Sequence, residues 1–286
     1  MSRWSESRKQ FRQVLSGQTC VYPGSVFDPV TARIAEDLGF EVGMFAGSIA
    51  SLTVLAAPDL ITLTLTEFAD QAHRICRAGS LPLLCDADHG YGNALNVRRT
   101  VEELETAGVA ALSIEDTALP VPFGSNGKPQ LLSVEEGVGK MRAALDARRD
   151  PDLVIAGRTG AASISGIDDA IQRSKAYQEA GVDAIFLTGI KTRTDLETVA
   201  CEIDCPLILG GVGKELFDQT YLASHGVRIC LQGHQPYMAA VQAAHDALAA
   251  LRAGTLPHLI EGVASEELMR RVTRHDDYNR WMNDWL

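Results

Sequence analysis

The sequence predicts an α/β fold, a (β/α)₈ TIM barrel followed by extra C-terminal helices. A unit of roughly 30 residues, the size of one strand and one helix, recurs along the chain. The length of 286 residues suits one such barrel, which needs about 250, and leaves a short excess for terminal helices. The chain is 46% hydrophobic but only 6% aromatic. This aliphatic composition is typical of parallel strands that are buried on both faces.

A glycine stands just before most of the short apolar segments that we expect to be strands. These glycines are Gly39, Gly79, Gly108, Gly181 and Gly226. Because glycine adopts positive φ without steric cost, each is expected to end a helix and admit the chain to the next strand. The expected strands cover residues 19–25, 41–48, 81–88, 109–116, 152–158, 182–189, 206–211 and 228–233. Eight parallel strands close a barrel, and the GxGxxG that would favour an open doubly wound sheet does not follow the first strand.

Amphipathic helical patterns lie between the expected strands, and this alternation indicates a parallel sheet. They cover residues 66–79, 96–108, 134–149, 167–181 and 238–254. Capping residues are expected to begin several of the helices, namely Thr66, Asn96, Ser133 and Asp195.

We expect one domain over residues 1–286, with an N-terminal helix over 1–18 and a C-terminal helical extension over 256–286, where the repeat stops. The last stretch carries Tyr278, Trp281 and Trp285. A lone terminal helix cannot bury these rings on itself. We therefore expect it to pack on the barrel or on a neighbouring subunit.

Composition excludes several classes of partner. The formal net charge of −11 and the lack of a large basic cluster argue against nucleic-acid binding. The sequence has no apolar run of about 18 residues, and its start lacks the apolar core of a secretion signal. Six scattered cysteines form no paired zinc motif and are expected to be reduced, buried thiols. We therefore expect a cytoplasmic protein that binds neither membranes nor nucleic acids.

Acidic residues gather where the expected third and fourth strands end. Asp86 and Asp88 are two positions apart, so on a strand both would point into the barrel, with Glu115 beside them. Two buried carboxylates side by side repel, and a divalent cation would resolve this cost. Oxygen ligands with room for water suit Mg²⁺, although Mn²⁺ is possible. The alternative is that these acids cap helices or pair with an arginine.

Polar residues at other strand ends are candidates for substrate contacts. Arg158 ends an apolar strand, where its guanidinium would give a fixed fork for a substrate carboxylate; alternatively it neutralises Asp86 or Glu115. His234, at the end of the last strand, would bind substrate or carry a proton, unless it is structural. Ser48 follows a glycine and offers both an amide and a hydroxyl. His89 is a weaker candidate of the same kind as His234.

Four stretches resemble the isocitrate lyase/phosphoenolpyruvate mutase superfamily: YPGSVFDPVTARIAEDLGF, MFAGSIAS, DADHGYGN and SIEDTALP. The resemblance covers nearly the whole expected barrel. It implies Mg²⁺, an enolate-type intermediate from a 2-oxo acid, and a dimer or tetramer whose subunits exchange a C-terminal helix. It also implies that Asp86 binds the metal directly, that Asp88 and Glu115 hold metal-bound waters, and that Ser48 and Arg158 hold the substrate carboxylate and oxo group.

Within this superfamily the chain is most similar to the oxaloacetate decarboxylase branch. Lyase members carry a cysteine in the lid after the IED motif, whereas residues 120–128 here contain none. SVFDP, SLTVLAAPD, DADHGYGNALNV, VEEGVGK and Gly233-His234 resemble the decarboxylase branch. In two places the chain departs from the branch, at the glycine after Arg158-Thr159 and at the apolar LGGVG that ends the seventh strand.

We therefore predict a Mg²⁺-dependent lyase that decarboxylates oxaloacetate, or a close 2-oxo diacid, to pyruvate and CO₂ through a metal-stabilised enolate. The alternative is a C–C hydrolase or lyase on a related 2-oxo acid, resembling oxaloacetate hydrolase, methylisocitrate lyase or the phosphonopyruvate enzymes. The residues also leave open a Schiff-base enzyme that uses Lys191, a phosphate cradle at LGGVGKE, and a barrel that binds ligands without catalysis.

Overall fold

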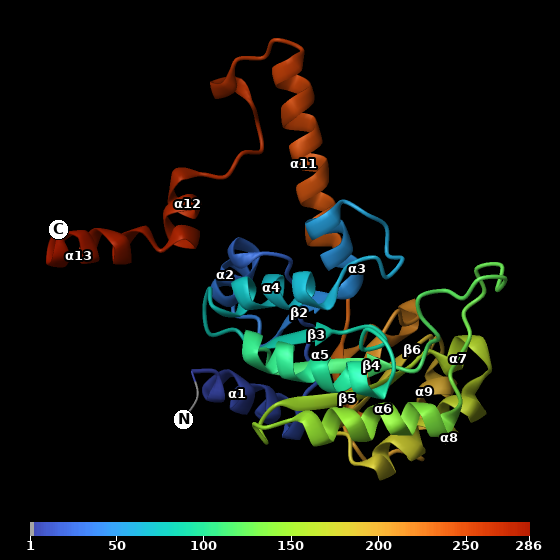
Figure 1. Ribbon diagram of the computed structural model, residues 1–286. Coiled ribbons are helices and arrows are strands. Elements are labelled where there is room, and N and C mark those ends of the chain that lie inside the picture. Colours follow the sequence, from blue (N-terminus) through green and yellow to red (C-terminus); the bar gives the residue numbers. More distant parts are fainter. Residues whose placement is uncertain (1–2) are drawn as a thin grey trace.

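The computed structural model describes residues 3–286 and contains eight parallel strands that follow one another around a barrel (Figure 1). Each strand pairs in parallel with the next one in the chain. The strands are β1 (Gly24–Ser25), β2 (Gly43–Ala46), β3 (Leu83–Asp86), β4 (Ala111–Glu115), β5 (Val154–Thr159), β6 (Ala184–Thr188), β7 (Leu207–Gly210) and β8 (Val227–Cys230). The predicted eight-stranded α/β barrel is confirmed.

A single isolated bridge closes the circle between the first and last strands. Val21, three residues before β1, pairs in parallel with Ile229 of β8. The Val21 amide donates to the Arg228 carbonyl at 2.9 Å, and the Cys230 amide donates to the Val21 carbonyl at 3.0 Å. The first strand is therefore much shorter than its predicted range of 19–25.

Helices alternate with these strands, as the sequence pattern predicts. The elements before β5 are α1 (Ser5–Ser16), α2 (Pro29–Asp37), α3 (Gly47–Ala50), the π-helix η1 (Ser51–Leu55), α4 (Leu65–Cys76), α5 (Ala94–Ala107) and α6 (Val134–Ala147). Those after it are α7 (Ala161–Ile164), α8 (Ile167–Ala180), α9 (Arg193–Ala200), the 3₁₀ helix η2 (Lys214–Leu216), α10 (Gln219–Ser224), α11 (Gln235–Arg252), the 3₁₀ helix η3 (Pro257–Leu259), α12 (Glu266–Thr273) and α13 (His275–Trp285).

Three of the four predicted N-cap residues are wrong. Ser133 is the N-cap of α6, as predicted, but the N-caps of α4, α5 and α9 are Thr64, Asn93 and Thr192 rather than Thr66, Asn96 and Asp195. Asn96 and Asp195 are instead the N3 partners of capping boxes, in which a side chain accepts from the N-cap amide. These three helices therefore begin a few residues earlier than the sequence pattern predicts.

Four of the five predicted helix-ending glycines have positive φ, at Gly39, Gly108, Gly181 and Gly226. Gly79 does not belong to this group, so the predicted reason for a glycine there is wrong. A Cβ at Gly79 would overlap with the carboxylate of Glu36, which accepts from the Ser80 amide at 2.8 Å. Close approach of a side chain, rather than a left-handed backbone, explains this glycine.

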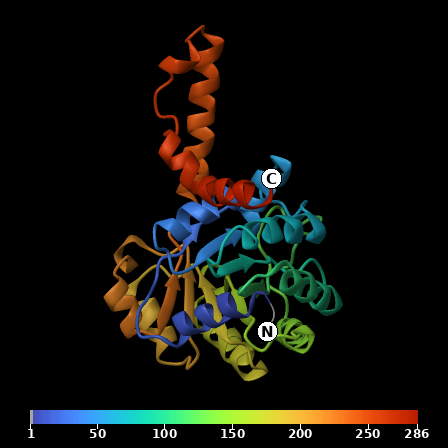
Figure 2. The same ribbon diagram turned by 90° about the vertical axis from the view of Figure 1, so that its left-hand side faces the viewer.

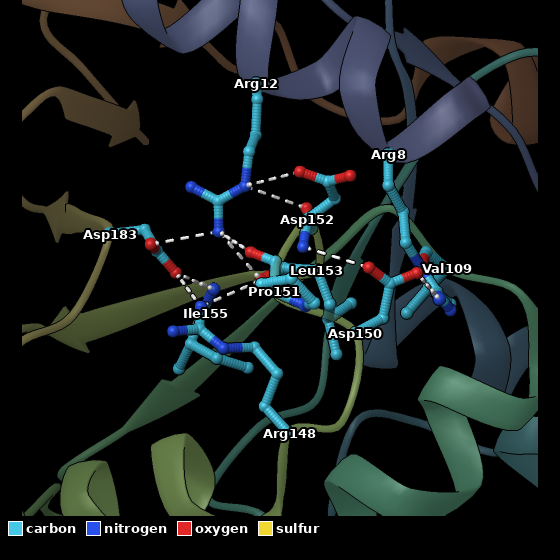
Figure 3. A network of polar contacts seen from close by, with 10 residues as sticks. All are labelled: Arg8, Arg12, Val109, Arg148, Asp150, Pro151, Asp152, Leu153, Ile155 and Asp183. Atoms are coloured by element: carbon cyan, nitrogen blue, oxygen red, sulfur yellow. Dashed lines mark hydrogen bonds and ion pairs between the residues drawn. The ribbon is translucent and has the colours of Figure 1, made fainter. Parts of the chain in front are cut away.

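Helix α1 covers the N-terminal ends of β4, β5 and β6 through an arginine–aspartate network (Figure 3). The buried Arg8 donates to the carbonyls of Val109 and Glu105 and to the carboxylate of Asp150, the last at 2.6 Å. Arg12 reaches Asp152 and Asp183, and Arg148 pairs with Asp183 at 2.6 Å. The helix lies within the predicted range 1–18, of which residues 1–2 fall outside the described part.

The C-terminal extension leaves the barrel and then returns to it. Figures 1 and 2 show α11 projecting away from the barrel, and none of its 18 residues is buried against the described chain. Arg274, just after α12, pairs with Asp37 of α2 at 2.8 Å, and Arg33 donates to the Val272 carbonyl at 2.9 Å. This contact anchors α12 on the barrel.

The aromatic residues of α13 are not buried by the barrel, contrary to one of the two predicted packings. Trp281 and Trp285 stack with ring centroids 5.9 Å apart, and Trp285 is 73% exposed. Exchange of this extension between subunits remains a prediction. Within residues 3–286, no helix is both long and apolar enough to span a membrane.

Candidate active site

A cavity of about 340 Å³ lies at the C-terminal ends of the strands, and all six predicted site residues line it. They come from five separate parts of the barrel and are Ser48, Asp86, Asp88, Glu115, Arg158 and His234. Apolar residues that include Met44, Phe186 and Leu231 complete the wall. Since loops at this end carry the active site in barrels of this kind, the cavity is the candidate active site.

Arg158 and Asp86 form an ion pair in the wall of the cavity. Asp86 is the last residue of β3; one carboxylate oxygen pairs with Nη1 of Arg158, and the other accepts from the Ser113 hydroxyl at 2.9 Å. The other arginine nitrogen, Nη2, lies 3.3 Å from Glu115 Oε2. In this structure Arg158 thus pairs with both acids, which is the contact that its predicted alternative role, neutralising them, requires.

The guanidinium of Arg158 keeps capacity for a further partner. Its Nε is buried and has no hydrogen-bond partner in the described part of the chain. Its Cζ lies 5.2 Å from the centroid of the Phe186 ring, which supports the flat face of the group. Burial acts to lower the pKa of Arg158, but the charges of Asp86 and Glu115 outweigh it and raise the pKa, so the group stays cationic.

Asp88 reaches the cavity in a different way from the predicted one. The strand ends at Asp86, and Asp88 has a φ of +48°, so the two acids do not share one strand face. A Cβ at residue 47 would overlap with the Asp88 carboxylate, which explains why Gly47 precedes Ser48. Burial raises the pKa of Asp88, and the charges of Asp86 and Glu115 raise it further. The carboxylate is thus electrostatically disfavoured where it stands.

Sequence reasoning missed one acid of the cavity, Asp59. It lies in the irregular segment between η1 and α4, where no strand or helix periodicity directs attention to it. Burial raises the pKa of Asp59, and the charge of Asp86 adds to the effect. The SLTVLAAPD stretch, which contains this residue, is the signal that could have found it.

His234 lies beyond the last strand rather than at its end. Strand β8 stops at Cys230, Gly233 has a φ of +91°, and His234 is the N-cap residue of α11. Its Nδ1 lies 2.9 Å from the hydroxyl of Ser25, at the end of β1. Burial lowers the pKa of His234, although the charge of Asp86 opposes the effect, and this favours the neutral ring.

Three other polar residues near strand ends do not line this cavity. His89 is buried with Nδ1 lacking a partner in the described chain, and burial, together with Lys140, lowers its pKa to about 4. Asp116 accepts from Tyr177 at 2.6 Å and from Arg173 at 3.0 Å, which makes it structural. Lys191, the residue that a Schiff-base enzyme would use, is exposed.

The acids of the cavity form a donor set that suits a hard cation. The described cavity wall has four carboxyl groups, of Asp59, Asp86, Asp88 and Glu115, against the single guanidinium of Arg158. In residues 3–286, no three acidic, histidine or cysteine side chains are arranged as a complete metal cage. Mg²⁺ does not require one, because it is usually held by one or two carboxylates and keeps several waters. The excess negative charge and the oxygen donors fit this ion.

Comparison with known proteins agrees with this geometry. Residues 11–252 match the sequence pattern of the family described as phosphoenolpyruvate phosphomutase. The chain belongs to this family. A relative named oxaloacetate decarboxylase, from Rhodopseudomonas palustris (strain BisB18), is 59% identical over 271 residues, which are 95% of this chain and 94% of that protein. The predicted superfamily is therefore confirmed.

Solved structures of similar proteins share the whole fold. Oxaloacetate acetylhydrolase in complex with the inhibitor 3,3-difluorooxalacetate is 25% identical with a TM-score of 0.87, covering 99% of this chain and 98% of that one. Phosphonopyruvate hydrolase in complex with oxalate and Mg²⁺ is 27% identical with a TM-score of 0.86, covering 98% and 99%. Both cover the barrel and the C-terminal helices.

Proposed function

We propose that this protein decarboxylates oxaloacetate to pyruvate and CO₂. The observation that carries the proposal is the convergence of one arginine, one histidine and four acids on a single cavity. The predicted enzyme class is confirmed by relatives named oxaloacetate decarboxylase that are 59% and 60% identical over almost the full length. The lid, which has no cysteine, agrees with a reaction that expels CO₂ and needs no thiol acid.

A divalent cation, Mg²⁺ or Mn²⁺, would be held by Asp86 together with Asp88 and Glu115. When bound, it supplies a Lewis acid for the negative charge that develops on the C2 oxygen, worth several kcal/mol. The electrostatic cost of the clustered acids supports this assignment, because burial and like charges raise the pKa of Asp88. A bound cation removes that cost.

Arg158 and Ser48 would hold the C1 carboxylate and the C2 oxo group of the substrate. The guanidinium is already oriented by Asp86, Glu115 and the Phe186 ring, so little order is lost when it takes up an anion. His234 would face the C4 carboxylate. When the C3–C4 bond breaks, its electron pair passes through C3 to the C2 oxygen, CO₂ leaves, and a proton added at C3 completes pyruvate.

A product assay tests this proposal against its rivals. Incubation with oxaloacetate and Mg²⁺ should yield pyruvate and CO₂ in equal amounts, and a chelator should abolish turnover reversibly. Oxalate plus acetate would instead indicate a hydrolase, in keeping with the shared fold of oxaloacetate acetylhydrolase. Inactivation by borohydride in the presence of substrate, with no effect of chelator, would indicate a Schiff base at Lys191. Either result would overturn the decarboxylase proposal.

The assembly is a further part of the proposal. The exposed apolar residues of α11 and the stacked tryptophans of α13 support a homo-oligomer, a dimer or tetramer, in which this extension packs on a second subunit. Sedimentation of the wild-type protein beside a W281A/W285A variant would measure the mass. A wild-type protein that sediments as a monomer at all concentrations would contradict it. A cytoplasmic location remains a prediction.

A further inference from the structure

A buried serine contacts the histidine of the cavity. Ser25 ends β1 and His234 begins α11, so the two residues are 209 positions apart in the chain, yet Ser25 Oγ and His234 Nδ1 lie 2.9 Å apart. Ser25 is only 9% exposed, and among residues 3–286 its hydroxyl has no other side-chain or backbone partner. The Ser25 hydroxyl therefore has one interaction, and it is with the ring of His234.

The direction of this hydrogen bond follows from the single hydroxyl proton. A buried O–H must find an acceptor, because an unsatisfied buried donor is costly. Nδ1 accepts only when it carries no proton, so a neutral ring then carries its proton on Nε2. Burial lowers the pKa of His234, although the charge of Asp86 opposes this, and the lowered pKa favours the neutral ring. Nε2, the nitrogen not engaged by Ser25, then offers an N–H.

The charges in the cavity give this N–H a role. Oxaloacetate has two carboxylates, whereas Arg158 is the one cationic side chain among the described residues of the wall. A second full positive charge at the C4 carboxylate would stabilise the substrate more than the transition state, since that carboxylate becomes neutral CO₂. A neutral N–H can orient the group without this penalty.

We propose that Ser25 is a positioning residue that fixes His234 in the tautomer with its proton on Nε2, so that His234 presents a neutral N–H donor to the departing carboxylate. This inference rests on the proposed decarboxylase function. It adds a residue from β1 to the site and states which of the two ring nitrogens contacts the substrate. Ser25 acts through His234 and does not touch the substrate itself.

The tautomer is measured directly by ¹⁵N NMR of protein labelled at histidine. The two-bond correlations of the His234 ring, assigned by their disappearance in an H234Q variant, should show Nε2 protonated in the wild type. The S25A variant should show a mixture of tautomers, and the S25T variant, which keeps a hydroxyl, should restore the wild-type pattern. A wild-type ring protonated on Nδ1, or a pattern that S25A does not change, would overturn the proposal.

Kinetics provide the second measurement. S25A should lower kcat for oxaloacetate about tenfold, the loss expected for one hydrogen bond, with a smaller change in KM. S25T should recover most of kcat, whereas S25V, which has the shape of threonine without the hydroxyl, should not. A general loss of folding would affect S25T and S25V alike. Equal rates for S25T and S25V would contradict the role of the hydroxyl.

The chain offers a matched control in a second serine–histidine pair. Ser224 Oγ lies 3.1 Å from His225 Nδ1 in an exposed position before β8, outside the cavity. S224A should leave kcat and the His234 tautomer unchanged. If the wild type does not decarboxylate oxaloacetate, the proposed function fails, but the NMR experiment still decides whether Ser25 fixes the ring. The two failures are therefore distinguishable.

Discussion

The two ends of the barrel carry very different charge arrangements. At the N-terminal end, three arginines meet three aspartates, and every one of these side chains has an ionic partner: Arg8, Arg12, Arg148, Asp150, Asp152 and Asp183 (Figure 3). At the C-terminal end, the described cavity wall sets Arg158 alone against four acids. One end is balanced and covered by α1, and the other is unbalanced and open.

This difference separates stability from function along the barrel axis. Paired charges that satisfy backbone carbonyls, as Arg8 does for Val109 and Glu105, hold the strand starts together. Clustered buried acids destabilise the folded chain, because like charges repel and burial disfavours the charged form. Such a cluster is expected where a cation or a substrate binds and offsets this cost. Substitutions at the C-terminal end should therefore lower activity more than stability, and substitutions at the N-terminal end should lower stability more than activity.

The largest effect is expected for Asp86→Asn. The amide keeps an oxygen for Ser113 but removes the charge that we assign to metal binding. We expect kcat/KM for oxaloacetate to fall about a thousandfold, since the metal is worth several kcal/mol and each 1.4 kcal/mol is about tenfold. Pyruvate formation measures it, and D70N, at an exposed aspartate of α4, is the control. A loss of less than about tenfold would remove Asp86 from the site.

Arg8→Met should lower stability and leave KM unchanged. It leaves Asp150 without its arginine and the carbonyls of Val109 and Glu105 without a donor. We expect a loss of about 3 kcal/mol in the free energy of unfolding, and hence a Tm lower by about 6 °C. Calorimetry measures Tm, and K9M, on the exposed side of α1, is the control. A changed KM in folded R8M protein would contradict the view that the N-terminal end contributes only to stability.

Asp88→Asn should lower activity while sparing stability. A residue that orients metal-bound groups costs roughly 10- to 100-fold in activity when removed. The substitution also removes a carboxylate whose ionised form burial and neighbouring charges disfavour. In chelator, D88N should melt no lower than the wild type. Mg²⁺ should raise the Tm of the wild type more than that of D88N. A marked drop of Tm in chelator would show that Asp88 is structural.

The smallest predicted effect is the pH dependence of the stability that Asp150 contributes. Burial acts to raise the pKa of Asp150, but hydrogen bonds from Arg8 and from the Asp152 amide outweigh it and lower the pKa. A lowered carboxyl pKa gives stability above the unfolded value of about 4, which is lost as pH falls through the folded value. The Tm gap between the wild type and D150N should therefore be widest near neutral pH and should close as pH falls below the lowered pKa of Asp150. A gap independent of pH would contradict this assignment.

The residues that could be predicted from the sequence are those fixed by strand periodicity. Asp86, Glu115 and Arg158 lie at or next to the ends of regular strands, where the barrel rule directs attention. The contact between Ser25 and His234 could not be predicted, because 209 residues separate the pair and only closure of the barrel brings them together. Asp59 lies in a segment without strand or helix periodicity, so only the SLTVLAAPD stretch itself could have pointed to it.

Helix starts are predicted a few residues late for a related reason. Asp195 is the N3 partner of Thr192 in a capping box, and both members of such a box look like N-caps in a sequence. Thr66 has a capping side chain too, but the N-cap of α4 is Thr64, two residues earlier. Asp88 illustrates the opposite limit. Its spacing from Asp86 predicts that both side chains share one strand face. Strand β3 instead ends at Asp86, and Asp88 itself has a left-handed backbone and reaches the cavity from the loop after the strand.

The single bridge between Val21 and Ile229 determines how few backbone contacts join the first and last strands of the barrel. Strands β2 to β8 form one continuous hydrogen-bonded ladder, and this ladder carries Asp86, Glu115 and Arg158. The seam between β8 and β1 is thin, and Ser25 and His234 stand on its two sides. The contact between the Ser25 hydroxyl and the His234 imidazole thus adds a further link across the two strands that a single bridge joins.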